Sequence, residues 1–200
     1  MIMTSHSPKK VYLSRYRRKR ERRTDYRRRL RLLQSGAPRL VVRQSNRYIN
    51  AQLVVYGEDG DKTVAEFSSR NLSKFGWKGD EDNIAAAFLT GLALAKVARE
   101  SGFKAEMVVP DLGMHSPHKG GRVFALLMGA SEGGLPVNVG EEATLDESAL
   151  RMEALAKYAA ELKAADQKAY AQRFSRYVSR GLEPEGLPAH FDEIRKSLGA

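Results

Sequence analysis

The chain has 200 residues, of which 42% are hydrophobic, and no cysteine. This is enough for one sizeable core, and it excludes disulfides and thiolate metal sites. No apolar run approaches the roughly 20 residues of a membrane span, and no apolar stretch follows the basic N-terminus, so we expect a soluble cytoplasmic protein without a signal peptide.

The net charge of +10 is unevenly distributed along the chain. Residues 1–35 hold 13 of the 34 basic residues and only two of the 24 acidic ones, which gives this segment a net charge of +11. The remaining residues therefore carry a net charge of −1. Such a split predicts a near-neutral globular protein with a basic arm that binds nucleic acid or an acidic membrane surface.

The arm divides into an expected tail and an expected helix. Residues 1–14 contain nothing periodic to bury, whereas residues 15–34 are good helix formers, with Tyr26, Leu30 and Leu33 spaced to lie on a core. Residues 15–23 contain seven basic side chains and no aliphatic one. Because like charges repel, we expect this half to become ordered only when an anion neutralises it.

Short strands should follow the arm after Gly36 and Pro38. The pattern predicts strands at about 40–42, 48–56 and 62–67, with turns at 44–47 and 57–61. Such short connections favour an antiparallel meander.

The segment after the meander alternates between helix and strand. A loop at 68–83 should lead into a buried helix that starts at residue 84, with Asp80 or Asp82 as its cap, and Gly102 should end that helix. A buried strand at 107–109, a helix at 122–132 and a short strand at 137–139 should follow. This order predicts an α/β protein with helices packed against a mixed sheet.

The last quarter of the chain is helical in character. Residues 146–165 read as one long helix, and Tyr170, Phe174 and Tyr177 sit at helical spacing in the next segment. A break at 181–188 precedes a final short helix with Phe191 and Ile194 on its apolar face. We therefore divide the chain into a basic RNA-binding arm (1–35), a globular α/β core (36–145) and a helical C-terminal appendage (146–200).

The basic arm is the strongest functional signal, because Lys and Arg bind phosphates and arginine also stacks on unpaired bases. The interleaved rings of Tyr12, Tyr16 and Tyr26 can stack likewise. A solvated charge run or a localisation signal is the alternative. A membrane-surface helix would need an apolar face that residues 15–25 lack, and no helix-turn-helix with a basic second helix is evident.

Two further segments are candidates for RNA contact. The first is the rim at 43–48, where Arg43, Ser45, Asn46, Arg47 and Tyr48 crowd a strand end, although an ordinary turn would look the same. The second is the segment 115–122, whose glycines and basic residues precede a helix and form a candidate phosphate seat. It lacks the phosphate-loop pattern, and its two histidines fit surface residues better than metal ligands.

An enzyme is not expected from the carboxylates. A two-metal nuclease needs several converging acidic groups. Asp111 follows a strand, but its partners would be Asp59 and Asp61 in a hairpin turn, and Glu66 has no evident partner.

Six segments in this order resemble the universal large-subunit ribosomal protein family eighteen, in its archaeal and eukaryotic form. They are Arg-Arg-Thr-Asp-Tyr (22–26), Arg-Leu-Val-Val-Arg-Gln-Ser-Asn-Arg-Tyr-Ile (39–49), Ser-Lys-Phe-Gly-Trp-Lys (73–78), Asn-Ile-Ala-Ala-Ala-Phe-Leu-Thr-Gly-Leu (83–92), Gly-Gly-Arg-Val-Phe-Ala-Leu (120–126) and Arg-Phe-Ser-Arg-Tyr (173–177). One departure is visible, because Arg22 stands where the family often has glycine.

The resemblance implies a three-layer α/β/α core with a mixed sheet, and no cofactor. It also implies binding of 5S rRNA, docking of that RNA on the large-subunit rRNA, and contact with the neighbouring 5S-binding protein of universal family five. An RNA-binding module that tolerates many sequences and acts outside the ribosome is the alternative function. The residues expected to face RNA are Lys9, Lys10, Tyr12, Arg15, Tyr16, Arg17, Arg18, Lys19, Arg20, Arg22, Arg23, Thr24, Tyr26, Arg27, Arg28, Arg43, Ser45, Asn46, Arg47, Tyr48, Lys74, Trp77, Lys78, His118, Lys119 and Arg122.

Overall fold

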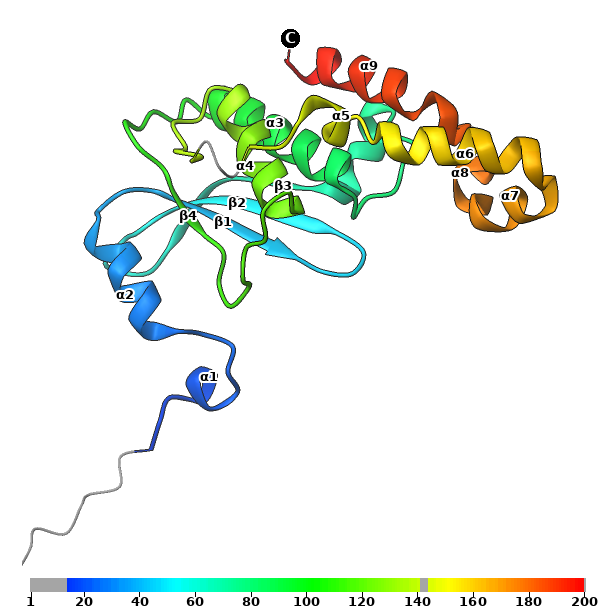
Figure 1. Cartoon of the computed structure of the whole chain (residues 1–200). Helices are drawn as coiled ribbons and strands as arrows, with labels where there is room; N and C mark the ends of the chain where they lie inside the picture. The colour runs from blue at the N-terminus through cyan, green and yellow to red at the C-terminus, as the bar shows by residue number, and fades with distance from the viewer. Residues whose placement is uncertain (1–13, 141–143, 200) are drawn as a thin grey trace, which may run out of the picture.

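A four-stranded mixed sheet forms the base of the core in the computed structural model, which describes residues 14–140 and 144–199 (Figure 1). Its strands are β1 (Arg39–Gln44), β2 (Ile49–Val55), β3 (Lys62–Ser68) and β4 (Val109–Asp111), in the order β3-β2-β1-β4. The first three form the predicted antiparallel meander, and β4 pairs with β1 in parallel. The expected α/β class with a mixed sheet is confirmed.

The sheet has one apolar and one polar face, as the period-two alternation of its strands requires. Leu40 pairs with Leu53 across β1 and β2, and both side chains are fully buried. The alternate positions Arg43, Asn50 and Glu66 are exposed on the opposite face. The apolar face therefore demands a cover along its whole length, whereas on the polar face Arg39 is buried.

Two helices provide this cover, namely α3 (Ile84–Glu100) and α4 (Arg122–Glu132), with α3 in direct contact with β2 and β3. The Asn83 side chain caps α3 by accepting the N–H of Ala86 at 2.7 Å, so the prediction of Asp80 or Asp82 as the cap was wrong. Asp80 instead lies within 4 Å of two arginines of the appendage.

The contact between α3 and α4 depends on two glycines that face each other's backbone. A Cβ on Gly91 would lie 2.0 Å from the carbonyl oxygen of Leu126, and a Cβ on Gly129 would lie 2.0 Å from that of Phe88. The two helix backbones therefore approach more closely than any side chain would permit.

The appendage consists of five helices, α5 (Glu147–Leu150), α6 (Glu153–Ala165), α7 (Gln167–Arg173), α8 (Ser175–Ser179) and α9 (Leu187–Gly199), with a 3-10 turn at Pro184–Gly186. The prediction of one helix over 146–165 was wrong, because Met152 adopts a left-handed φ of 56° between α5 and α6. This break lets α5 pack on α3 while α6 packs on α9, and it buries both Leu150 and Ala159.

The final helix fastens the appendage to the core and lies on the outer side of α3 (Figure 1). Phe191 and Ile194 are buried as predicted, and the ring centroid of Phe191 lies 5.7 Å from that of Phe88. Arg195 binds both carboxylate oxygens of Glu132 on α4, at 2.7 and 2.6 Å, and also pairs with Glu147 on α5. These hydrogen bonds raise the pKa of Arg195. The sheet thus forms the first layer, α3 and α4 form the second, and α9 lies on the outside of α3.

The predicted loop at 68–83 contains a 3-10 helix, Ser69–Phe75, followed by the buried ring of Trp77. This ring stacks on His190 of α9 with centroids 5.3 Å apart, and its N–H donates to the Asp80 carbonyl oxygen at 3.1 Å. The N–H of Lys78 donates to Nε2 of His190 at 3.2 Å. Trp77 thus packs the appendage against the core, and we leave it out of the proposed RNA contacts.

Two short strands were misplaced along the chain. β4 runs over Val109–Asp111 and not over 107–109, and Met107 is half-exposed. Val137 makes only an isolated parallel bridge to Val108, where a strand at 137–139 was expected. A run of three apolar residues cannot fix strand bounds, because its neighbours decide which of them pair. Among the described residues, no helix combines the length and the apolar character that crossing a membrane requires.

Replacing Gly91 with alanine should destabilise the protein by about 3 kcal/mol, the upper end of overpacking costs. The new methyl group would collide with the backbone of α4. Thermal unfolding should show a drop in Tm of about 6–12 °C. The matched control is Gly199→Ala in α9, where nothing lies within 4 Å. Equal Tm values for the two variants would contradict the close-packed helix pair.

The contact between Trp77 and His190 should weaken in acid. Burial lowers the pKa of His190 below 6.5, although Glu193 opposes this, so the unfolded chain takes up the proton first. Stability should therefore fall as the pH drops below about 6.5 and through the lower pKa of the folded state. Because Trp77 is the only tryptophan in the sequence, its fluorescence reports this pH-dependent step in stability. His190→Gln should remove it, and a step that persists in this variant would refute the assignment.

Candidate nucleic-acid interface

The arm contains two helices joined by a tight bend, α1 (Arg17–Arg20) and α2 (Tyr26–Gln34), so the prediction of one helix over 15–34 was wrong. Arg22 adopts a left-handed φ of 52° within the bend, at the position where glycine is frequent in the family it resembles. Asp25 then caps α2 by accepting the N–H groups of Arg27 and Arg28 at 3.0 and 3.2 Å. The cap starts a new helix, which the uniform helix propensity of the sequence concealed.

Most of the expected apolar stripe of the arm faces solvent. Tyr26 and Leu30 are 36% and 58% exposed, so the expectation that they lie on the core was wrong, whereas Leu33 is half-buried. Tyr16 is 75% exposed, and its ring centroid lies 5.6 Å from that of Tyr26. The two rings give the arm an accessible aromatic surface of the kind that stacks on unpaired bases.

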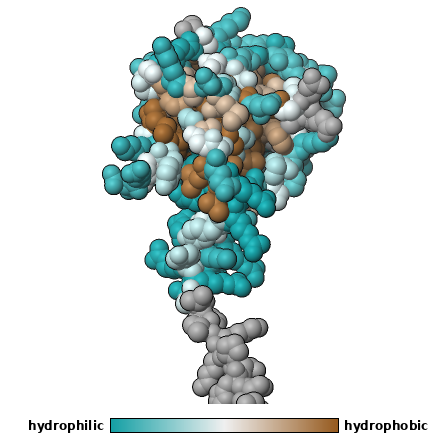
Figure 2. Space-filling view, turned by 90° about the vertical axis from the view of Figure 1, so that its left-hand side faces the viewer, coloured by the Kyte–Doolittle hydropathy of each residue, from teal (hydrophilic) through white to brown (hydrophobic). Residues whose placement is uncertain are grey.

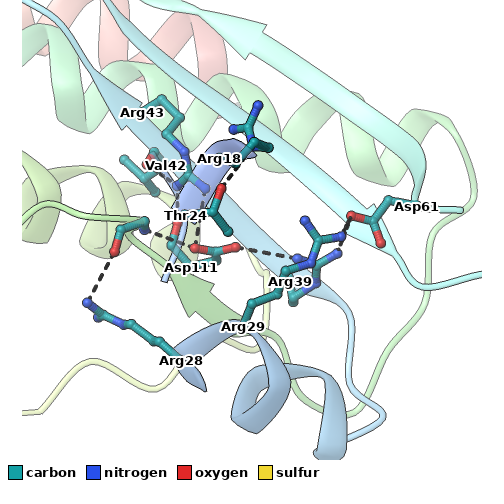
Figure 3. A network of polar contacts seen from close by, with 10 residues as sticks. Arg18, Thr24, Arg28, Arg29, Arg39, Val42, Arg43, Asp61 and Asp111 are labelled. Atoms are coloured by element: carbon teal, nitrogen blue, oxygen red, sulfur yellow. Dashed lines mark hydrogen bonds and ion pairs between the residues drawn. The ribbon is translucent and has the colours of Figure 1, made fainter. Parts of the chain in front are cut away.

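Two aspartates hold Arg39 and Arg43 of β1, the strand next to the edge strand β4 (Figure 3). We call this region the sheet edge. Arg39 is 2% exposed and places its guanidinium 2.8 Å from Asp61 and 3.4 Å from Asp111. Arg43 lies 3.3 Å from the carboxylate of Asp111 and donates to the Asp111 carbonyl oxygen at 2.7 Å. A buried guanidinium needs such partners, because its charge cannot be neutralised by losing a proton.

The same pair of aspartates fastens the arm (Figure 3). Arg29 of α2 lies 2.8 Å from the Asp61 carboxylate. Arg28 donates to the carbonyl oxygen of Gly113 at 3.3 Å, and the N–H of Gly113 donates to Asp111 at 2.9 Å. Among residues 14–140 and 144–199, no group of three or more His, Cys, Asp or Glu could hold a metal ion. Asp61 and Asp111, weighed as nuclease ligands from the sequence, are thus partners of arginines.

A cleft of about 490 Å³ opens between the bent arm and the sheet edge. Its acidic members, Asp25 and Asp111, are engaged by the cap and by the arginines described above. Figure 2 shows the arm as a column of hydrophilic surface that projects from the rest of the molecule. Six arginines line the cleft: Arg18, Arg22, Arg23, Arg28, Arg29 and Arg43.

The rim forms a second basic surface. The Ser45 hydroxyl accepts the N–H of Tyr48 at 2.9 Å and donates to its carbonyl oxygen at 2.9 Å, so it shapes the turn and leaves Asn46 and Arg47 exposed. Arg122 donates to the Ser45 carbonyl oxygen at 3.4 Å and to that of Asp82 at 2.9 Å. The structure therefore brings the 43–48 and 118–122 segments together. The sequence of either segment alone could not predict this proximity.

Two arginines, Arg176 of α8 and Arg180 directly after that helix, lie beside the rim and were not among the predicted site residues. Arg180 donates to the Gly79 carbonyl oxygen at 2.6 Å, and Arg176 lies 3.5 Å from Asp80. Both line a cavity of about 330 Å³ together with Arg47 and Tyr48. Their i, i+4 spacing on a short helix was the available signal, but only the fold shows that the helix meets the rim.

The remaining predicted residues are dispersed over the surface or lie outside the described residues. Lys9, Lys10 and Tyr12 belong to the latter group. Thr24 lines the cleft and accepts a hydrogen bond from Arg18 at 2.9 Å. The exposed residues are Arg15, Arg17, Lys19, Arg20, Arg27, Lys74, Lys78, His118 and Lys119.

A basic arm bent over the edge of an α/β core, with an arginine-lined cleft between them, is the architecture of a nucleic-acid-binding protein. Residues 10–101 match the family model described as "Ribosomal large subunit proteins 60S L5, and 50S L18". The chain is 46% identical over 188 residues to the large ribosomal subunit protein uL18 of Caldivirga maquilingensis, covering 94% of this chain and 90% of that protein. It is 43% identical over 183 residues to uL18 of Aeropyrum pernix, covering 91% and 85%.

The chain belongs to the uL18 family of large ribosomal subunit proteins. This confirms the resemblance seen in the six sequence segments. It also agrees with the expectation that the chain is not an enzyme, since its relatives are large ribosomal subunit proteins.

Replacing Asp111 with asparagine should lower the free energy of unfolding by about 3 kcal/mol, because it leaves the buried charge of Arg39 with one partner and removes the carboxylate beside Arg43. Urea unfolding measures the change. Asp59→Asn is the matched control, because Asp59 is exposed in the β2–β3 turn and has no ion pair among the described residues. Comparable losses in the two variants would refute the role assigned to Asp111.

Proposed function

We propose that this protein binds 5S rRNA and anchors it to the large-subunit rRNA, in contact with the neighbouring 5S-binding protein of universal family five. The observation that carries this proposal is the arginine-lined cleft between the arm and the sheet edge. Six guanidinium groups around one concavity match a phosphate backbone, since arginine forms paired hydrogen bonds to phosphate oxygens. Family membership supports the assignment to the large ribosomal subunit.

The geometry suggests a division of labour between arm and core. α1 buries no side chain, so neutralisation of its arginines by phosphate is its main source of order. The sheet edge is fixed by Asp61 and Asp111 and offers Arg43 in a defined position. We therefore assign affinity mainly to the arm, and shape recognition to the edge, the rim and the 118–122 segment.

A salt titration of binding to 5S rRNA tests the proposal. If about 6–8 phosphates are neutralised, the slope of log affinity against log salt should be near −5 to −7. Replacing the cleft residues Arg18, Arg22, Arg23 and Arg28 with glutamine should reduce the magnitude of this slope by about 3.

The control removes the same charge from exposed lysines outside the cleft, with Lys104, Lys157, Lys168 and Lys196 changed to glutamine. It should leave the slope nearly unchanged. A length-matched RNA serves as competitor at moderate salt. Equal affinity for both RNAs would overturn the 5S assignment in favour of an RNA-binding module that tolerates many sequences. Equal slopes for the two quadruple variants would remove the cleft from the interface.

A further inference from the structure

The cavity between the rim and α8 has walls from three separate parts of the chain. The rim contributes Arg47 and Tyr48, and the loop before α3 contributes Glu81 and Asp82. The appendage contributes Arg176 of α8 and Arg180, which directly follows that helix. Its volume of about 330 Å³ admits a group of the size of one nucleotide base with its sugar. It is separate from the cleft beside the arm, with which it shares no lining residue.

The walls of this cavity are fixed in place. Arg122 ties the rim to the loop by donating to the carbonyl oxygens of Ser45 and Asp82. Tyr177, next to Arg176 in α8, is buried beside Asp80, and burial raises its pKa to about 12, so the hydroxyl stays neutral. Arg180 donates to the Gly79 carbonyl oxygen at 2.6 Å. The cavity therefore needs little reorganisation to receive a ligand.

The charges around the cavity are mixed and partly unused. Arg176 and Arg180 lie 3.5 and 3.9 Å from Asp80. Among the described residues, by contrast, the carboxylates of Glu81 and Asp82 have no hydrogen bond or ion pair. A bare phosphate would be repelled by these two carboxylates. The fitting ligand carries a negative group at one end and hydrogen-bond donors at the other.

We propose that this cavity holds one unpaired guanine nucleotide of the bound rRNA, an inference that rests on the proposed function. A carboxylate accepts two hydrogen bonds side by side, and guanine alone among the four bases offers two adjacent donors, N1–H and the N2 amino group. The ring of Tyr48, which carries the guanidinium of Arg70 over one face, supplies a stacking surface with its other face, and Arg176 and Arg180 face the phosphate.

The other bases fit this arrangement less well. Adenine presents the acceptor N1 beside its amino group, and cytosine presents the acceptor N3, so each would set a lone pair against a carboxylate. Uracil has one donor between two carbonyl acceptors. The carboxylates of Glu81 and Asp82 therefore act as selective groups, while Arg176 and Arg180 act on any nucleotide.

The test compares the binding of three dye-labelled pentanucleotides, UUGUU, UUIUU and UUAUU, to the full chain by fluorescence anisotropy, where I is inosine. Inosine keeps N1–H but lacks the N2 amino group, so affinity should fall in the order guanine, inosine, adenine, with about tenfold or more between the extremes. The arm cannot produce this order, because its phosphate contacts are common to all three RNAs.

Variants separate the two kinds of contact. The double change Glu81→Gln and Asp82→Asn should abolish the preference for guanine, whereas Arg176→Gln with Arg180→Gln should weaken all three RNAs equally. The matched control is Glu58→Gln with Asp59→Asn, in the exposed β2–β3 turn.

Equal affinity for the three RNAs, or a preference that survives the loss of Glu81 and Asp82, would overturn the inference and leave the cavity to a charged side chain of a neighbouring protein. The 5S rRNA titration distinguishes this failure from failure of the proposed function. Intact 5S binding without a preference for guanine would remove only the cavity. A preference for guanine without selective 5S binding would remove only the ribosomal RNA assignment.

Discussion

The buried guanidinium of Arg39 is the constraint around which the arm and the sheet edge are built. It sits at the start of β1, where it cannot lose its charge, and it needs anionic partners from elsewhere in the chain. Asp61 comes from the turn before β3 and Asp111 from the end of β4, so both outer strands must be in register for the charge to be met. The same carboxylates engage Arg29 of the arm and Arg43. The sheet, the arm and the cleft thus share one electrostatic centre.

The appendage is fixed by a different kind of contact at the opposite side of the core. Phe191 packs on Phe88, His190 stacks on Trp77, and Arg195 bridges two glutamates on separate helices. These contacts also restrain α8, which is joined to α9 by residues 180–186, including the 3-10 turn Pro184–Gly186. Arg176 of α8 and Arg180 directly after it are positioned in this way.

Much of the fold could be predicted because its signals are local. The alternation in β1 to β3 reports one buried face, and the apolar residues of α3 and α9 have helical spacing, so their positions agree with the structure. The breaks at Arg22 and Met152 could not be predicted, since both residues favour helices and adopt a left-handed conformation only through their surroundings. The prediction of Asp80 or Asp82 as the cap was wrong because Asn83 stands at the position that the helix start requires.

The candidate interface was predictable by composition but not by arrangement. The arginines of the arm were evident from charge alone, and the cleft does include Arg18, Arg22, Arg23 and Arg28. The roles of Asp61 and Asp111 were missed, because these carboxylates were weighed as metal ligands of a nuclease and not as ion-pair partners of arginines. Arg176 and Arg180 were missed because they reach the rim from more than 120 residues further along the chain. Trp77 was expected to face RNA because the resemblance implied this for the whole 74–78 loop, whereas the structure buries its ring against His190.

The attachment of the arm also dictates an order of events during synthesis. Arg28 is synthesised before its partner, because the carbonyl oxygen that accepts its hydrogen bond belongs to Gly113, 85 residues further along the chain. At ordinary rates of elongation this interval lasts about ten seconds, during which the arm lacks the carbonyl oxygen of Gly113 and the Asp111 carboxylate that holds Gly113. Each nascent chain therefore exposes a highly basic peptide in a compartment crowded with RNA before its own fold can hold that peptide. A chaperone with an acidic binding surface would have its natural target in this window.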